Sequence, residues 1–149
     1  MKIPALKATK ILVSGLVLIF ATDHYAYADD QDVITYRQMI MKELDAEAGA
    51  LGMIVSGQIP PDSLSLQTRA IVISAKSALK AFESKVPGGG SRPEVWSKWD
   101  DFSRRIQSFG QKAEAMAKAG ETGNMATVME LIDAAMPCKQ CHDVYRVKK

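Results

Sequence analysis

This chain of 149 residues has little net charge, no excess of proline or glycine, and few long apolar runs. Nineteen basic side chains against 17 acidic ones leave a formal net charge of +2, which is too small to favour nucleic acid or acidic lipid as a partner. Six prolines and ten glycines, with 47% hydrophobic and 24% charged residues, exclude collagen-like and disordered sequence. The composition indicates one ordinary globular domain.

The first 28 residues have the pattern of a secretory signal peptide. Three lysines lie among the first ten residues, an apolar run follows at 11–21, and Ala26-Tyr27-Ala28 fits the small-x-small cleavage rule. At about 1.5 Å per residue the run covers only roughly half of a ~30 Å hydrocarbon core, which favours cleavage over an uncleaved membrane anchor. We therefore expect export to the periplasm and a mature domain, residues 29–149, without stable membrane insertion.

The mature chain is close to neutral and poor in metal ligands. Removal of residues 1–28 takes away three lysines, Asp23 and one of two histidines, and leaves 16 basic and 16 acidic side chains. The remaining histidine, His142, lies within five positions of both cysteines, Cys138 and Cys141. This cluster is the most informative feature of the sequence.

Four segments show helical periodicity, and none shows the strict alternation typical of a half-buried strand. They span about residues 32–56, 65–85, 91–120 and 124–149, and turn-forming clusters of proline or glycine separate them. Such segments with short loops predict an all-α fold, an antiparallel four-helix bundle. The positions expected to face the core are Ile34, Arg37, Met41, Leu44, Ala48, Leu51 and Val55; Thr68, Ile71, Ala75, Ala78 and Phe82; Val95, Trp99, Phe102, Ile106, Phe109, Ala113 and Met116; and Val128, Leu131, Ala135, Cys138, His142 and Tyr145.

Residues 138–142 read Cys-Lys-Gln-Cys-His, the C-x-x-C-H pattern of c-type haem attachment. At about 100° per residue, Cys141 and His142 lie on either side of Cys138, so all three side chains meet one side of a helix. Two thiols can then form thioethers with the porphyrin while the imidazole reaches the iron. A structural zinc site needs four ligands, and the mature chain has three such residues. A disulfide or thiol redox centre is the other alternative, but it favours a βαβ context that is absent here.

Four stretches extend this pattern over nearly all of the mature chain: Tyr36-Arg37-Gln38, Gly57-Gln58-Ile59-Pro60, Ser91-Arg92-Pro93-Glu94-Val95-Trp96, and residues 138–146. Together they resemble the cytochrome c′ family, the class II c-type cytochromes. The resemblance implies a four-helix bundle that carries one haem c, with its iron, near the C-terminus. It also implies that Cys138 and Cys141 bind the haem covalently and that His142 is the proximal iron ligand.

The resemblance also locates the residue on the other side of the iron. Counted from Tyr36-Arg37-Gln38, the family's distal position falls on Met41, which the periodicity places facing the core. Typical high-spin members have a bulky residue there that does not ligate, whereas in the low-spin branch, cytochrome c-556, a methionine coordinates the iron. We expect Met41 to be a ligand, because a His/Met pair keeps the iron six-coordinate in both oxidation states. The alternative is that Met41 only fills the core.

Three polar residues are candidates for the periphery of the haem. Arg37 is the one charged residue on the first core-facing stripe, and haem propionates are its expected partner, because an unpaired buried charge is costly. Alternatively, its guanidinium extends to solvent. The resemblance also implies that Gln38 lies near the haem propionates. Arg146 either helps to orient the haem or only interacts favourably with the dipole at the C-terminal end of its helix. Pro137 is expected to bend the chain just before the motif.

The sequence therefore predicts a periplasmic protein that carries single electrons through a haem with His142 and Met41 as axial ligands, and no enzymatic activity. Its partners would be periplasmic redox proteins, and the family resemblance allows a homodimer through the first two helices, with Met39, Ile40 and Ile73 as outward apolar residues. The rival interpretation is a five-coordinate protein that binds nitric oxide or carbon monoxide. Peroxidase-like or thiol chemistry is not favoured, because the mature chain has no second histidine and its cysteines are assigned to haem.

Overall fold

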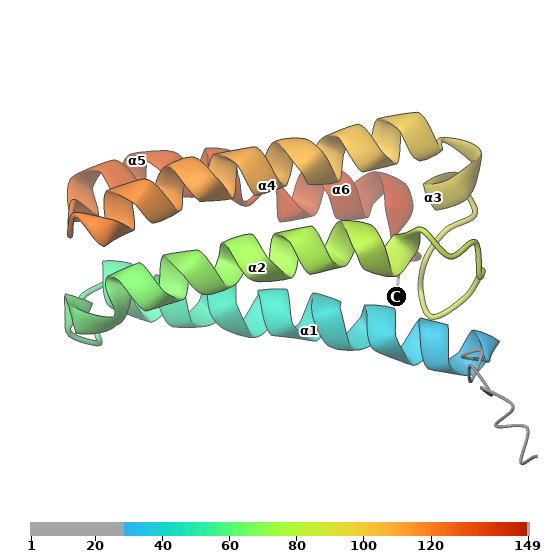
Figure 1. The fold of residues 1–149 in the computed structure, drawn as a ribbon, viewed down its shortest axis with the longest axis horizontal. Helices are drawn as coiled ribbons and strands as arrows, with labels where there is room; N and C mark the ends of the chain where they lie inside the picture. The colour runs from blue at the N-terminus through green and yellow to red at the C-terminus, as the bar shows by residue number, and fades with distance from the viewer. Residues whose placement is uncertain (1–28, 149) are drawn as a thin grey trace, which may run out of the picture.

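The long helices of this protein run side by side along one axis (Figure 1). The computed structural model describes residues 29–148, and the expected signal peptide lies outside this range. Within it the elements are α1 (Asp30–Val55), the short 3₁₀ helix η1 (Pro61–Ser63), α2 (Leu64–Phe82), α3 (Glu94–Ser97), α4 (Trp99–Glu121), α5 (Met125–Ala135) and α6 (Cys138–Tyr145). The four rods of the bundle are α1, α2, α4, and α5 followed by α6, which confirms the predicted all-α four-helix architecture.

Local sequence signals set where the helices begin and end. The Asp29 side chain accepts a hydrogen bond of 2.7 Å from the backbone N–H of Asp32 and so caps α1. Asn124 caps α5 in the same way through the N–H of Thr127, at 3.1 Å. Gly57 follows α1 with φ +76°, a conformation that glycine adopts without steric cost.

The buried side chains form two clusters along the bundle, and 12 of the 25 expected core-facing positions lie in them, while six more pack against them. The cluster near α6 contains Ile40, Ala78, Ala81, Phe82, Val95, Phe102, Ile106 and Tyr145. The cluster near α5 contains Leu51, Ile54, Leu64, Ile71, Ala113, Met116, Val128 and Ala135. Helix α2 packs between α1 and α4, and α4 also packs on α5.

The third predicted helix is not continuous, so the expectation of one helix from about residue 91 was wrong. The chain leaves helical geometry at Lys98 (φ −122°, ψ 42°), which separates α3 from α4. The buried side chain of Val95 and a 3.0 Å hydrogen bond from Trp96 Nε1 to the Phe82 carbonyl oxygen hold α3 against the end of α2. The apolar spacing passes through the break unchanged, so periodicity could not reveal it.

The fourth predicted helix is also divided, at Met136 and Pro137. Proline has no N–H to donate to the carbonyl four residues earlier, and here the expected bend is a complete interruption, with Met136 at φ −127° and ψ 67°. Helix α5 ends at Ala135 and α6 begins at Cys138. The C-x-x-C-H motif therefore occupies a separate helix of eight residues, whose direction is not fixed by α5.

One of the three residues expected to face outward on the first two helices is buried. Ile40 is only 8% exposed and packs in the cluster near α6, because it lies three residues after Arg37 on the same inward stripe of α1. Met39 and Ile73 are 60% and 65% exposed, as expected. Whether they contribute to a homodimer stays a prediction.

We predict that Gly120→Ala lowers the free energy of unfolding by about 1–3 kcal/mol, because overpacking a tight contact forces neighbours to move. A Cβ at Gly120 in α4 would clash with the fully buried side chain of Thr68 in α2. Gly110→Ala in the same helix is the matched control: a Cβ there meets nothing within 4 Å, so it should stabilise by about 0.5–1 kcal/mol. Denaturant titration measures both, and equal effects would show that α2 and α4 do not meet tightly at Gly120.

Candidate functional site

A cavity of about 870 Å³ lies inside the bundle, beside α6. Helix α1 lines it over several turns from Ile34 to Ala48, α4 lines it from Phe102 to Lys112, and the loop at residues 89–91 closes one side. Ligand pockets in proteins usually measure about 300–1,000 Å³, so this cavity is at the upper end of the range. It can enclose a large, mostly apolar cofactor.

The three motif residues all line this cavity. Cys141 and His142 are half-buried, and Cys138 is exposed. Both cysteines are free, and partial desolvation of the sulfur by the surrounding residues raises the pKa of each thiol, although Cys138 as a whole residue is exposed; a reactive redox cysteine instead has a low pKa. Burial, helped by the positive charge of Arg146, lowers the pKa of His142 and favours the neutral imidazole, the form that ligates metals.

Among residues 29–148, no group of three or more histidine, cysteine, aspartate or glutamate side chains is arranged to hold a metal ion. The motif in α6 places two thiols and one imidazole at the lining of the large cavity. That set fits covalent attachment of a macrocycle with one axial ligand to its metal.

Met41 lines the same cavity from α1 and is half-buried. It packs against the buried cluster near α6. Met39, on the same helix, is exposed and does not line the cavity. Met136 also lines the cavity, next to Pro137, a position that no pattern in the sequence indicates. Met41 therefore offers a thioether to the cavity from α1, whereas the motif residues line the cavity from α6.

Arg37 is buried inside the bundle, with 2% of its surface exposed, so the alternative that it extends to solvent is wrong. Its guanidinium carbon lies 5.4 Å from the centre of the Phe82 ring and 5.0 Å from that of Trp96. These aromatic faces attract the cation, and burial lowers the pKa of Arg37. Nη1 and Nη2 have no hydrogen-bond partner among the described residues. Because Arg37 also lines the cavity, these donors fit an anionic group there, such as a haem propionate.

Gln38 also lines the cavity and holds the loop at its edge. The Gln38 side-chain Nε2 donates a 3.1 Å hydrogen bond to the carbonyl oxygen of Gly89. The loop approaches α1 so closely that a Cβ on Gly89, whose φ is +63°, would lie 2.5 Å from Ile34 Cγ2. The role of Gln38 that the geometry displays is therefore to fasten this loop, and its contribution to haem binding stays a prediction.

Arg146 lines the cavity at the end of α6, where the chain becomes extended. The backbone there pairs with Ser91 in an antiparallel bridge. On either side, the N–H of Arg92 donates to the Tyr145 carbonyl and the N–H of Val147 donates to the Gly90 carbonyl, both at 2.9 Å. The C-terminal end of α6 is thus tied to the same loop that Gln38 holds on α1.

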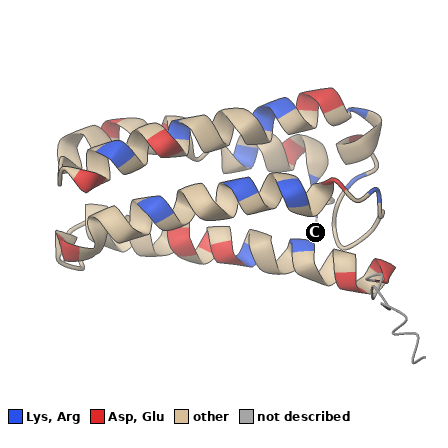
Figure 2. Ribbon diagram, viewed as in Figure 1, with Lys and Arg blue, Asp and Glu red and all other residues tan. Residues whose placement is uncertain are grey.

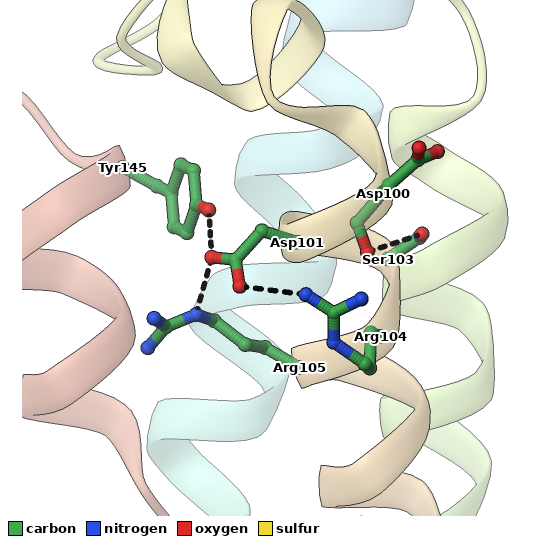
Figure 3. Close-up of polar contacts among 6 residues, drawn as sticks. All are labelled: Asp100, Asp101, Ser103, Arg104, Arg105 and Tyr145. Carbon is green, nitrogen blue, oxygen red and sulfur yellow. Dashed lines mark hydrogen bonds and ion pairs between the residues drawn. The ribbon is translucent and has the colours of Figure 1, made fainter.

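A polar cluster that the sequence did not reveal fastens α6 to α4 (Figure 3). The Tyr145 hydroxyl donates a 2.5 Å hydrogen bond to Asp101 Oδ2. Arg105 Nε donates to the same oxygen at 2.7 Å, and Arg104 donates to the other oxygen at 3.1 Å. The i,i+4 spacing of Asp101 and Arg105 was visible in the sequence, but nothing in it pointed to a hydroxyl 44 positions further along.

These contacts shift the pKa values of both partners. The hydrogen bonds from Tyr145 and from the arginines lower the pKa of Asp101 to about 2. Burial and the hydrogen bond to Asp101 raise the pKa of Tyr145 to about 12. The bond therefore persists over a wide pH range and holds the motif helix beside α4.

A model of the family described as cytochrome C′ matches residues 32–146, which is most of the chain. The chain belongs to the cytochrome c′ family. A cytochrome c′ of Alcaligenes xylosoxydans xylosoxydans is 31% identical over 126 residues, which cover 83% of this chain and 99% of the relative. A cytochrome c-556 of Agrobacterium fabrum is 31% identical over 120 residues, 76% of this chain and 80% of the relative.

Solved structures agree with this assignment. Ferric cytochrome c prime from Alcaligenes xylosoxidans superposes with a TM-score of 0.76 at 27% identity, over 83% of this chain and 99% of that one. A nitric oxide complex of a variant of the same protein has a TM-score of 0.76 at 26% identity, over the same shares of the two chains.

Membership of the family establishes the cofactor class. Cytochromes c′ bind haem c covalently, and Cys138 and Cys141 fit that attachment. The family consists of haem proteins that are not enzymes in the usual sense, and their roles are electron transfer or the binding of gases. Within residues 29–148, no helix combines the length and hydrophobicity that a bilayer crossing requires. The individual roles of Met41, Arg37, Gln38, His142 and Arg146 stay predictions.

The Asp101–Tyr145 bond makes stability depend on pH at both extremes. Because the pKa of Asp101 is lowered in the folded state, its contribution is present above about pH 4 and is lost as pH falls towards 2. Because the pKa of Tyr145 is raised, its contribution is lost as pH rises from about 10 towards 12. We predict that Asp101→Asn lowers the melting temperature at pH 7 and flattens its decline between pH 4 and 2.

The matched control is Asp100→Asn, one residue earlier in α4, whose carboxylate points away from Tyr145 (Figure 3). In this variant the melting temperature should decline between pH 4 and 2 as steeply as it does in the wild type. An equally steep decline for Asp101→Asn and the wild type would mean that Asp101 does not hold α6.

Proposed function

We propose that this protein is a periplasmic carrier of single electrons in which His142 and Met41 are the axial ligands of a covalently attached haem c. One observation carries the proposal: Met41 is half-buried and lines the same cavity as Cys138, Cys141 and His142. The pattern of residues 1–28 supports a periplasmic location. The partners would be other redox proteins of that compartment.

Each residue of the site has a distinct part in this proposal. Haem c, when bound, supplies an iron centre that exchanges one electron at a time. Cys138 and Cys141 would anchor the macrocycle through thioethers, and the His142 imidazole would be a ligand of its iron. The Met41 thioether, a soft and neutral ligand, would hold the iron from α1 and would favour its reduced state. Arg37 pairs its buried Nη groups with a carboxylate of the cofactor, which relieves the cost of leaving them without an acceptor.

The second candidate is a five-coordinate protein that binds a diatomic gas. What favours it is the likeness to solved structures of cytochrome c prime from Alcaligenes xylosoxidans in complex with nitric oxide. The relatives also include cytochromes c-556, so the comparisons do not separate the two candidates. The residue that separates them is Met41.

We predict a low-spin spectrum in both oxidation states, with a methionine-to-iron charge-transfer band in the ferric protein. Met41→Ala should remove that band and leave a high-spin haem, because the distal thioether is gone. Met39→Ala and Met136→Ala are the matched controls, one exposed on the same helix and one lining the same cavity, and both should retain the band. A high-spin wild type in both oxidation states would instead favour the gas-binding candidate.

We also predict that Arg37→Met lowers the reduction potential of the haem protein. A buried positive charge beside the cofactor favours the reduced, less positive iron, and methionine removes the charge while it fills much of the same space. Arg69→Met, which removes an exposed arginine from α2, should change the potential far less because solvent screens it. Potentiometric titration of the three proteins measures the difference, and equal shifts would refute an internal role for Arg37.

A further inference from the structure

Exposed positive side chains surround the cavity, although the mature chain as a whole is balanced at 16 basic and 16 acidic residues. Those that both line the cavity and lie exposed to solvent are Lys42, Arg104, Arg105, Lys112 and Arg146, which we call the cationic rim. They come from α1, from α4 and from the end of α6, so they approach the opening from three elements. Figure 2 shows basic positions along α4.

Acidic groups offset only part of this charge. Asp45 is the one exposed carboxylate that lines the cavity. Asp101 pairs with both Arg104 and Arg105, so the three together keep one positive charge. Lys42, Lys112 and Arg146 form no ion pair with any of residues 29–148. Because the whole domain is neutral, the excess of positive charge at the rim is matched by an excess of negative charge elsewhere on the surface.

We propose that the cationic rim is the docking surface for a redox partner protein that presents an acidic patch. This inference rests on the proposed electron-carrier function, because it concerns how the partner reaches the cofactor. Exposed charges of this kind contribute mainly to the rate of association and its dependence on salt, rather than to final affinity. Residues that line the cavity and also contact solvent mark where the cofactor comes closest to a partner. Electrostatic attraction of a partner to these residues therefore brings it within reach for electron transfer.

The first experiment uses small redox probes with the haem-loaded protein. The reduced protein loses one electron and the probe gains one, with no proton transferred. Hexacyanoferrate(III) is the anionic probe, and tris(phenanthroline)cobalt(III) is the cationic one. We expect stopped-flow rates with the anion to fall as ionic strength rises, and rates with the cation to rise. The same salt dependence for both probes would overturn the rim proposal and leave the electron-carrier function standing. Reaction with neither probe would refute that function itself.

The second experiment reverses one charge at two places on the same helix. Lys112→Glu alters the rim, whereas Lys118→Glu makes the same change in net charge six residues later, outside the cavity lining. With an acidic plastocyanin as protein probe at low ionic strength, Lys112→Glu should slow electron transfer by about threefold or more, and Lys118→Glu should have little effect. The Soret absorption and helical circular dichroism of both variants verify that they remain folded.

Equal slowing by the two variants would show that only net charge matters, and would overturn the rim as a docking surface. Vesicles that contain anionic phosphatidylglycerol provide the remaining comparison. One combination of results would show that the rim binds a membrane and would overturn the proposal. In that case the wild type binds the vesicles, Lys112→Glu does not bind them, and both proteins transfer electrons to plastocyanin at the same rate. Slower transfer to plastocyanin by Lys112→Glu alone, with no vesicle binding, supports it.

Discussion

The packing at one end of this bundle depends on the buried guanidinium of Arg37 and its contacts with two aromatic rings. Two aromatic rings, from Phe82 and Trp96, hold the charge, and they belong to the end of α2 and to α3. The terminal nitrogens of Arg37 have no hydrogen-bond partner among residues 29–148, so an acceptor inside the cavity would relieve the cost of leaving these donors unpaired. A cofactor with carboxylates meets this need, and its apolar body suits the remaining walls.

The same end of the molecule holds the motif helix by several independent contacts. The interruption at Pro137 frees α6 from the direction of α5, and the bond between Tyr145 and Asp101 fixes it to α4. Backbone pairing with the loop at residues 88–91 fixes its far end, and Gln38 fastens that loop to α1. The attachment residues are therefore positioned by contacts with α1, α4 and the loop, not by a continuous fourth helix.

Sequence patterns predicted those parts of this arrangement that depend on residues only a few positions apart in the chain. Spacing of three and four revealed the inward stripes, and the C-x-x-C-H motif revealed the site, because both signals lie within a few turns of helix. Periodicity does not reveal the break at Lys98, because Val95, Trp99 and Phe102 keep helical spacing across it. The outward prediction for Ile40 is wrong because Ile40 lies three residues after Arg37, on the same inward stripe of α1. The Asp101–Tyr145 bond joins distant positions, which no single sequence displays.

The proposed function depends on a haem that Cys138 and Cys141 bind covalently in the mature protein. Intact mass spectrometry of the protein secreted by a host that matures c-type cytochromes tests it most directly. The account predicts the mass of residues 29–149 plus one haem, with no thiol open to alkylation, and loss of the covalent adduct when both cysteines are replaced by alanine. Polypeptide mass alone, with both thiols freely alkylated, would contradict it.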